Sequence, residues 1–334
     1  MKVLVDCHGA DAGVQVAVEG ALDALNERKS LSVVLCGKKQ DIDKCLEGKT
    51  YDKERLEIKE AGEPITNDDA PALAIRRKKD SSMVLGLRAL AAGEADAMVS
   101  AGNTGSLLVG TQVIVKLIEG ATRATLASVV PTIKDTHTII VDSGANVDCR
   151  PEMLEEFAVM GDVYMRNIFG IERPTVGLLS NGAEEEKGTP AIKEAHALLK
   201  NGGLNFVGNI EARDVLTGAV DVLVTDGFAG NVAIKACEGM GKAMFSLIKE
   251  GIMQGGLKAK IGYLLLKNVF RGVKKRVSSD EVGGGVFLGA NKIVIKTHGA
   301  SNAFSYKKSI LNADRLAEKN VVGQIAEGLR KVKE

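Results

Sequence analysis

Short apolar runs of strand length alternate with longer stretches of helical pattern along most of this chain. Continuous apolar runs are typical of strands that are buried on both faces, and the helices between them supply the crossovers that parallel strands need. The alternation predicts an α/β fold: a mainly parallel sheet covered by helices. The expected strands are Val3–Val5, Leu31–Cys36, Ala97–Ser100, Thr138–Val141, Thr175–Leu179, Asn205–Val207, Val220–Thr225 and Lys292–Lys296.

Apolar residues at helical spacing mark the segments expected to cover this sheet. With 334 residues the chain exceeds the size at which a single hydrophobic core usually stops growing, which favours two lobes. We place residues 1–150 together with 285–334 in the first lobe, 151–250 in the second, and 251–284 in a protruding segment. The expected helices are Val14–Asn26, Asp80–Ala92, Thr104–Leu117, Pro151–Arg166, Pro190–Lys200 and Asn231–Ile248.

Composition and charge argue against several classes of protein. A formal charge of +1 does not suit a globally basic nucleic-acid binder. No apolar run reaches the roughly 18 residues of a membrane span, and the amino terminus does not resemble a signal peptide. The cysteines, at positions 7, 36, 45, 149 and 237, lack CxxC or zinc-type spacing, so we expect reduced thiols in a cytoplasmic protein, with no metal site and no cofactor.

Five loops rich in Gly and Asn follow apolar runs. Glycine allows a backbone to approach a ligand closely, and a turn into a helix amino terminus directs free N–H groups at an anion. In parallel sheets such loops gather where ligands bind, so they predict one shared cleft for phosphate. The alternative is five ordinary strand-to-helix turns. The loops are Gly102–Gly105, Asp142–Asn146, Ser180–Gly182, Asp226–Asn231 and His298–Asn302.

The segment Gly251–Ser279 contains seven Lys or Arg residues and no acidic residue, and its apolar residues have helical spacing. An amphipathic basic helix of this kind suits the surface of an anionic membrane. A helical hairpin packed against a second subunit requires the same pattern, and both interpretations can hold together. The residues expected to contact a membrane or carrier protein are Lys258, Lys260, Leu264, Leu265, Lys267, Phe270, Arg271 and Lys274.

A second basic cluster, Arg76-Arg77-Lys78-Lys79, stands just before Asp80 and Ser81, either of which could cap the next helix. We expect Arg76, Arg77 and Lys79 to recognise an anionic ligand or an acidic protein. A solvated surface with local ion pairs is the alternative.

Taken in order, the motifs of this chain resemble the bacterial acyl-acyl carrier protein:phosphate acyltransferases, commonly called PlsX. The resemblance covers nearly the whole chain. The opening Asp6-Cys7-His8-Gly9-Ala10-Asp11 departs from the family's usual Asp-Ala-Met-Gly-Gly-Asp, and Ala183, Ala229 and Ala300 are further departures. The motifs are Ala74–Met83, Ala101–Gly105, Gly144–Cys149, Glu184–Gly188, Gly208–Asp214, Asp226–Asn231 and His298–Asn302.

The resemblance implies a fold related to phosphotransacetylases and to the isocitrate and isopropylmalate dehydrogenases. It implies a homodimer attached peripherally to the inner face of the cell membrane, with the active site in a cleft. The implied reaction moves a long-chain fatty acyl group from acyl carrier protein to inorganic phosphate. The acyl phosphate would then supply a membrane glycerol-phosphate acyltransferase in phospholipid synthesis.

Phosphate is already an oxyanion at neutral pH, and a thiol with a pKa near ~8.5 is a tolerable leaving group. We therefore expect direct attack of phosphate on the thioester, without an acyl-enzyme. Lys187 would hold phosphate or the developing charge, Asn231 would cap a helix and present N–H groups, and His298 would donate to the oxyanion or protonate the departing sulfur. Each of the three also has a structural interpretation: a surface lysine, a helix cap and a structural hydrogen bond.

Further residues of the same loops are expected to bind phosphate or orient the thioester. Asp226 and Asp148 would repel phosphate directly, so we expect them to orient Lys187 or Arg213. The binding candidates are Asn103, Thr104, Gly105, Asn146, Gly188, Arg213, Asp226, Gly230, Ser301 and Asn302.

Two other functions remain open from the sequence. A phosphotransacetylase acting on an acyl-coenzyme A needs the same handling of thioester and phosphate. A non-catalytic membrane scaffold for acyl carrier protein would use only the two basic clusters. A dehydrogenase would need a dinucleotide fingerprint or clustered carboxylates for a metal, and neither is visible.

Overall fold

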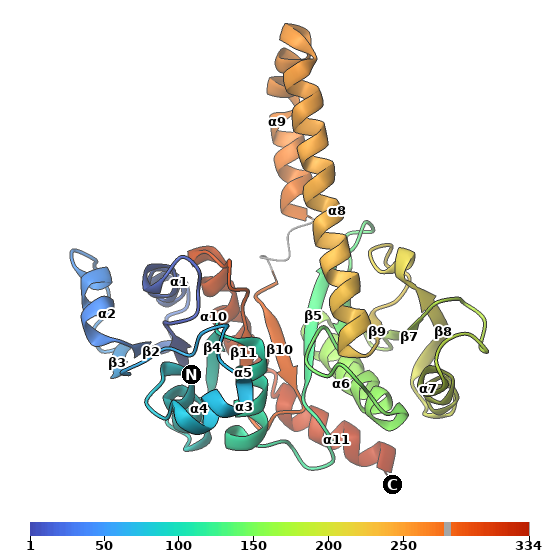
Figure 1. Cartoon of the computed structure of the whole chain (residues 1–334), viewed down its shortest axis with the longest axis horizontal. Coiled ribbons are helices and arrows are strands. Elements are labelled where there is room, and N and C mark those ends of the chain that lie inside the picture. The colour runs from blue at the N-terminus through green and yellow to red at the C-terminus, as the bar shows by residue number, and fades with distance from the viewer. Residues whose placement is uncertain (277–281, 334) are drawn as a thin grey trace.

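The computed structural model describes residues 1–276 and 282–333, and a single 11-stranded sheet runs through it (Figure 1). The strand order is β3-β2-β1-β4-β11-β10-β5-β6-β9-β7-β8. The strands are β1 (Lys2–Asp6), β2 (Ser32–Gly37), β3 (Leu56–Glu60), β4 (Ala97–Ser100), β5 (Thr125–Pro131), β6 (His137–Val141), β7 (Thr175–Ser180), β8 (Asn205–Glu211), β9 (Val222–Val224), β10 (Gly285–Leu288) and β11 (Ile293–Lys296).

The sheet consists of two parallel blocks joined by an antiparallel seam. β3, β2, β1, β4 and β11 are parallel to one another, and so are β6, β9, β7 and β8. β10 is antiparallel to both β11 and β5, and β5 is antiparallel to β6. The predicted fold class, a mainly parallel sheet covered by helices, is therefore confirmed. The expected division into two lobes stays a prediction.

All eight predicted strands are present, and three others were missed. β3 is an edge strand whose charged residues Glu57, Lys59 and Glu60 interrupt its apolar pattern. β5 and β10 form the antiparallel seam, which the βαβ alternation used for the prediction does not anticipate.

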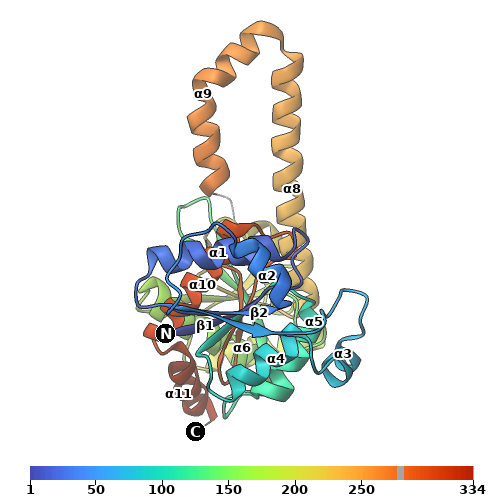
Figure 2. The same cartoon turned by 90° about the vertical axis from the view of Figure 1, so that its left-hand side faces the viewer.

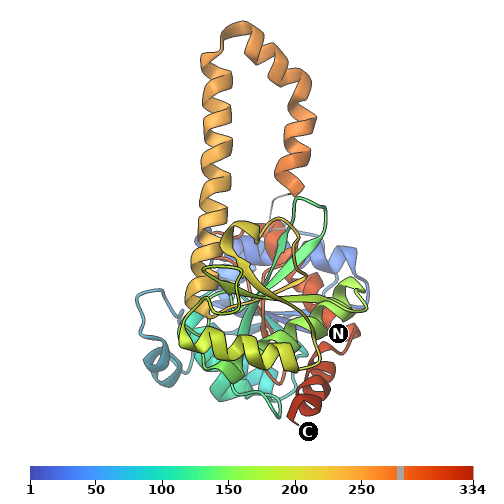
Figure 3. The ribbon, with the colours of Figure 1, turned by 90° about the vertical axis from the view of Figure 1, so that its right-hand side faces the viewer.

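The helices cover both faces of the sheet (Figures 1 and 3). Thr104–Leu117 was predicted as one helix, but the α-helix ends at Gly110 and continues as a π-helical turn, Thr111–Val115. Four helices were not predicted: α2, α3, α10 and α11. The helices are α1 (Val14–Glu27), α2 (Lys39–Leu46), α3 (Pro71–Arg77), α4 (Ser82–Ala91), α5 (Thr104–Gly110), α6 (Pro151–Phe169), α7 (Pro190–Asn201), α8 (Gly227–Gln254), α9 (Gly256–Arg276), α10 (Ala303–Glu318) and α11 (Val321–Lys333).

Alternate residues of each buried strand face opposite layers of the core. In β1, Val3 and Val5 belong to the cluster that packs against α1, α6, α10 and α11, whereas Leu4 belongs to the cluster packed against α4 and α5. A third, smaller cluster lies around Leu223 of β9 and contacts the first turns of α8. The sheet is thus buried on both faces, which explains why its strands have continuous rather than alternating apolar sequences.

Helices α8 and α9 leave the body together as a long two-helix hairpin (Figures 1, 2 and 3). This hairpin is the predicted protruding segment, although it begins within α8 rather than at residue 251. Val277–Ser279, the end of the predicted amphipathic segment, lie outside the described residues, and so does the side chain of Lys274. Among the helices described, none combines the length and the apolar character needed to cross a bilayer.

Candidate active site

Each of the five Gly/Asn loops follows directly the strand that the sequence predicted, at its carboxyl end. The loops follow β4, β6, β7, β9 and β11. The geometry of each loop decides which predicted side chains are available to a ligand and which are engaged in holding the loop.

A buried carboxylate organises the ends of β1 and β4. Asp6 accepts hydrogen bonds from Ser82 Oγ at 2.6 Å, from Ser100 Oγ at 2.6 Å and from the His8 N–H at 3.1 Å. Burial raises the pKa of Asp6, and these donors oppose that effect. The loops after the two strands approach closely, since a Cβ at Gly9 would lie 2.4 Å from the Gly102 Cα.

His8, Ser82 and Asp6 have the side chains of a nucleophilic triad but not its arrangement. His8 Nδ1 lies 3.1 Å from Ser82 Oγ, and this hydroxyl donates its proton to Asp6. In a working triad the histidine stands between the serine and the carboxylate. Ser82 is also fully buried, so this cluster positions the loop and does not supply a nucleophile.

The loop after β6 is closed around the buried Asp142. Its carboxylate accepts from the N–H groups of Gly144, Ala145 and Asn146 at 2.8–2.9 Å. The Asn146 amide donates to the Ala124 carbonyl oxygen at 2.8 Å and to Asp142. The side chain of Asn146, expected to bind phosphate, is therefore engaged within the loop.

Helix α8 begins four residues earlier than predicted, and this changes the role expected for Asn231. Asp226 is the amino-terminal cap, because its Oδ1 accepts from the Ala229 N–H at 2.7 Å. Asn231 does not cap the helix; it is exposed in the second turn. The prediction that Asn231 opens and caps this helix was wrong. Asp is also a preferred cap residue, and because Asp226 starts the helix earlier, Asn231 lies inside it.

The start of α8 is packed against the loop after β6. The Gly227 N–H donates to the Asn146 carbonyl oxygen at 2.7 Å, and a Cβ at Gly230 would lie only 1.9 Å from the Asp142 carbonyl oxygen. Gly230 is thus required for the close approach of helix and loop. The loops after β6 and β9 form one unit.

The loop after β11 reaches the same helix. His298 Nε2 lies 3.1 Å from Lys235 Nζ on α8, and His298 Nδ1 accepts from the Ala300 N–H at 3.2 Å. Burial first, and Lys235 second, lower the pKa of His298, so its ring is neutral near neutral pH. This contact joins the two parallel blocks of the sheet at their loops.

Two other predicted residues of these loops act as helix caps. Asn302 Oδ1 accepts from the Ser305 N–H at 3.0 Å at the start of α10, and Asn103 Oδ1 accepts from the Ser106 N–H at 2.8 Å at the start of α5. Thr104 is the first residue of α5. Ser301 is buried, with its hydroxyl 2.7 Å from that of Thr297. The side-chain oxygens of both asparagines are therefore occupied in this structure.

The remaining predicted glycine of the α5 start, Gly105, lies against α3. A Cβ there would lie 2.8 Å from the Pro71 ring. On the same side of the molecule, Ser81 caps α4, as the sequence allowed, by accepting from the Val84 N–H at 3.3 Å. The basic residues Arg76, Arg77 and Lys79 at the end of α3 are exposed.

Lys187 is exposed in the loop after β7, and its ammonium has no ion-pair partner among the described residues. Of the neighbouring acidic residues, Glu185 pairs with Lys200 at 2.6 Å. The backbone is held elsewhere: Asn209 Nδ2 donates to the Glu184 carbonyl oxygen at 2.7 Å. Gly188 takes a φ of 103°, a conformation that favours glycine. In the part of the chain that the structure describes, no hydrogen bond or ion pair joins Lys187 to His298 or Asn231.

The carboxylates expected to orient Lys187 or Arg213 do not do so. Asp226 caps α8, and Arg213 pairs with Glu211 at 2.5 Å and with Asp214 at 4.0 Å. The prediction failed because Glu211 is only two residues from Arg213 in the chain. The guanidinium pairs with this local carboxylate and not with a carboxylate of another loop. Asp148 is exposed.

Lys296, at the end of β11, was missed by the sequence analysis. Its Nζ donates to the Ala101 carbonyl oxygen at 3.1 Å and to the Thr297 carbonyl oxygen. Burial lowers its pKa to about 8. A lysine that ends a buried apolar strand immediately before a Gly/Asn loop was the available signal.

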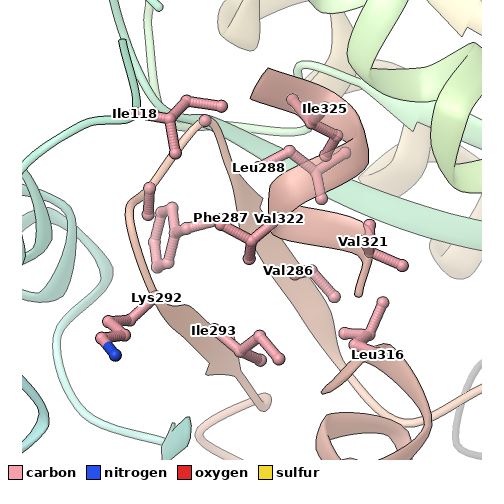
Figure 4. A pocket seen from close by; sticks show the side chains of 12 residues that line it. Ile118, Val286, Phe287, Leu288, Lys292, Ile293, Leu316, Val321, Val322 and Ile325 are labelled. Atoms are coloured by element: carbon pink, nitrogen blue, oxygen red, sulfur yellow. The ribbon is translucent and has the colours of Figure 1, made fainter. Parts of the chain in front are cut away.

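Over the described ranges, no group of three His, Cys, Asp or Glu side chains is arranged to hold a metal ion. A small apolar pocket lies between the β10–β11 turn and helix α11, with Ile118, Leu288 and Ile325 among its lining side chains (Figure 4). It is at the opposite end of β11 from Lys296 and contains none of the predicted site residues.

The comparisons with known proteins agree over nearly the whole chain. The family model described as "Fatty acid synthesis protein" matches residues 1–324. A protein named phosphate acyltransferase from Clostridium tetani is 43% identical over 329 residues, with 98% of each chain covered. The chain belongs to the phosphate acyltransferase family. A second member of this family, from Clostridium acetobutylicum, is 40% identical over 332 residues, with 99% of this chain and 100% of the relative covered.

Family membership confirms the resemblance seen in the sequence motifs and identifies the chain as an enzyme of the phosphate acyltransferase type. Solved structures support the fold. A phosphotransacetylase from Streptococcus pyogenes matches with a TM-score of 0.62 at 19% identity, covering 95% of this chain and 94% of that one. The EutD phosphotransacetylase from Staphylococcus aureus matches with a TM-score of 0.59 at 18% identity over the same shares.

Proposed function

We propose that this phosphate acyltransferase moves a long-chain fatty acyl group from the thioester of acyl carrier protein to inorganic phosphate. The observation that carries the proposal is membership of the family over nearly the full chain. The loops after β6, β9 and β11 add a physical basis, because they meet around the start of α8. Acyl phosphate formed there enters phospholipid synthesis through a membrane glycerol-phosphate acyltransferase.

Phosphate attacks the thioester carbonyl carbon directly, and the pantetheine thiolate leaves. The state of the cysteines supports this route, because a thiolate is the form that would attack to give an acyl-enzyme. Burial raises the pKa of all five thiols, to about 12 for Cys36 and Cys149. A thiol with so high a pKa stays protonated and is a poor nucleophile at neutral pH.

Charge that develops on the phosphate and on the carbonyl oxygen needs donors that are already in place. Lys187 supplies a cation that no protein carboxylate neutralises among the described residues. The lowered pKa keeps His298 neutral, and because its Nδ1 accepts from the Ala300 N–H, its one ring proton is on Nε2. This Nε2–H donates to the oxyanion rather than serving as an acid toward sulfur. Asn231, exposed on the second turn of α8, orients the thioester or phosphate with its amide.

In this proposal, acyl carrier protein and the membrane bind to two different surfaces of the enzyme. The exposed cluster Arg76, Arg77 and Lys79 suits an acidic carrier protein. The α8–α9 hairpin, with Leu264 and Leu265 exposed beside lysines, attaches the cytoplasmic enzyme peripherally to the inner face of an anionic membrane. A homodimer would cover part of the same hairpin.

The deciding experiment incubates the protein with a long-chain acyl carrier protein and phosphate, and traps acyl phosphate with hydroxylamine. The proposal expects phosphate-dependent hydroxamate from acyl carrier protein and much less from acyl-coenzyme A. Preference for acyl-coenzyme A would instead identify a phosphotransacetylase. Carrier binding without turnover would identify a scaffold.

Replacing Cys149, the cysteine of the Gly144–Cys149 motif, tests the mechanism separately. Cys149→Ala should retain the wild-type rate, since direct attack does not use this thiol. Isolation of an acyl-cysteine from the wild-type enzyme, by mass spectrometry after rapid quenching, would refute direct attack.

A further inference from the structure

Lys296 ties together loops from two strands. It ends β11, next to the end of β4, and its ammonium donates to the Ala101 carbonyl oxygen on the β4 side and to the Thr297 carbonyl oxygen on its own side. The side chain is half-buried. An ammonium group has three N–H donors, so one donor remains after these two bonds. Within the described residues no further acceptor takes it.

The charge of Lys296 also has no direct counter-ion among the described residues. Asp6 is the carboxylate that acts most strongly on its charge, but the oxygens of Asp6 already accept from Ser82 and Ser100. For a half-buried cation without an ion pair, two carbonyl hydrogen bonds replace only part of the hydration that burial removes. The lowered pKa, about 8, is the consequence.

Charged groups from several elements face this ammonium. Asp6 comes from β1, Asp11 from the loop before α1, Lys235 from α8, and His298 from the loop that Lys296 itself begins. Lys235 in turn lies 3.1 Å from His298 Nε2. Lys235 also pairs with Glu238 at 3.2 Å, so its charge is already balanced within α8. Lys296 is thus the cation without a direct ion pair where loops of both parallel blocks come together, among the described residues.

We propose that Lys296 is a phosphate-binding residue: its remaining N–H donates to an oxygen of the inorganic phosphate held at the junction where loops 101–105 and 298–302 meet helix α8. The proposal rests on the proposed function and assigns its phosphate site to this junction. The bound phosphate supplies the negative charge that no described carboxylate places in direct contact with the Lys296 ammonium. The phosphodiester of the carrier's pantetheine arm presents the same kind of oxygen, so the KM for acyl carrier protein is measured beside the KM for phosphate to distinguish the two.

The binding of phosphate then depends on pH. Lys296 is mostly protonated at pH 7 and mostly neutral at pH 9, because its pKa is about 8. The affinity for phosphate should fall as pH rises through this range. Arginine stays protonated throughout. A loss of affinity that occurs in the wild type and not in Lys296→Arg therefore belongs to Lys296 and not to the ionisation of phosphate.

The test compares Lys296→Met and Lys296→Arg with Lys292→Met, a matched control at the residue that immediately precedes the same strand. Two readouts are used on the full-length protein: the rise in melting temperature caused by phosphate, and the KM values for phosphate and for acyl carrier protein. Lys296→Met should raise the phosphate KM roughly tenfold or more, as expected for one charge-assisted bond, and abolish the phosphate-dependent rise in melting temperature. The KM for acyl carrier protein and the Lys292→Met variant should stay near wild type.

Three outcomes decide the proposal. An unchanged phosphate KM in Lys296→Met, or a rise only in the KM for acyl carrier protein, overturns it while leaving the proposed function intact. If the wild type forms no acyl phosphate but phosphate still stabilises it in a Lys296-dependent way, the proposed function fails and the phosphate site stands. Should Lys296→Met fold poorly, the test uses Lys296→Arg, whose affinity for phosphate should not fall between pH 7 and pH 9. If its affinity falls with pH as in the wild type, Lys296 does not bind phosphate.

Discussion

Helix α8 belongs to two regions that are stabilised in opposite ways. At its start it is held by the body: Asp226 caps it, and Gly227 and Gly230 are buried against the loop after β6. Beyond Lys235 it enters the hairpin with α9, where large apolar side chains face solvent. These are Met240, Met244, Leu247, Met253, Leu257, Ile261, Leu264, Leu265, Leu266, Val269 and Val273.

The difference shows that the body completes its own core and the hairpin does not. A soluble surface rarely keeps so many neighbouring apolar side chains without a partner. The hairpin is therefore built for a surface outside the chain, and a membrane or a second subunit are the two partners that its composition suits. Because α8 is continuous, it also places that surface at a fixed position relative to the candidate active site.

The largest expected effect comes from crowding the body end of α8. Gly230→Ala would bring a Cβ to within 1.9 Å of the Asp142 carbonyl oxygen, so helix and loop must separate. We expect a loss of about 3 kcal/mol or more in the free energy of unfolding, together with a large loss of activity. Chemical denaturation and the hydroxamate assay measure the two effects. A variant as stable and active as wild type would contradict the close packing described here.

An intermediate effect is expected from charges placed on the hairpin. Leu265 is 81% exposed, and the double variant Leu264→Asp with Leu265→Asp removes apolar contact and adds repulsion from anionic lipid. Sedimentation with vesicles of anionic lipid should show at least about tenfold weaker binding, with little change in melting temperature. Ile133→Asp is the control, because Ile133 is 72% exposed but lies on the body. If the hairpin variant and Ile133→Asp lose vesicle binding equally, the hairpin is not the specific membrane-binding surface.

A smaller effect is expected at the cap. Asp226→Ala leaves the Ala229 N–H without its acceptor and should cost about 1 kcal/mol of stability, whereas Asp226→Asn keeps a capping oxygen and should cost less. Thermal unfolding of the three proteins measures the difference. If both variants behave alike, the negative charge and not the cap is what matters at this position.

The smallest effect has the opposite sign. A Cβ at Gly239, on the exposed part of α8, meets nothing within 4 Å, so Gly239→Ala gains helix propensity without a clash. We expect a stabilisation of up to about 1 kcal/mol. Since Gly239 and Gly230 are on the same helix, a destabilising Gly239→Ala would show that the hairpin is packed against something in the free protein.

The sequence predicted the parallel blocks well because their strands are buried on both faces and so have continuous apolar runs. It missed β5 and β10 because antiparallel pairing leaves no crossover helix to mark it. The loops were placed correctly at the carboxyl ends of their strands. The side chains of Asn103, Asn302 and Asp226 cap helices. A sequence pattern cannot distinguish a capping side chain from a ligand-binding one, because both functions use the same residue types in the same loops.

Residues whose role depends on distant partners were the hardest to predict. Lys296 gains its properties from Ala101 and Asp6, which are far from it in sequence. Arg213 was assigned to a distant carboxylate although Glu211 stands two positions away. Lys187 could be named from its motif, but its distance from His298 depends on the packing of two strand blocks that no local pattern encodes.

The central claim is that loops from both parallel blocks hold one phosphate. A crystal structure of the protein with bound phosphate tests it most directly. The account predicts a phosphate contacted by Lys296 or His298 from one block and by α8 or Lys187 from the other. Phosphate bound by loops of a single block, with the other block's loops turned away from it, would contradict the account.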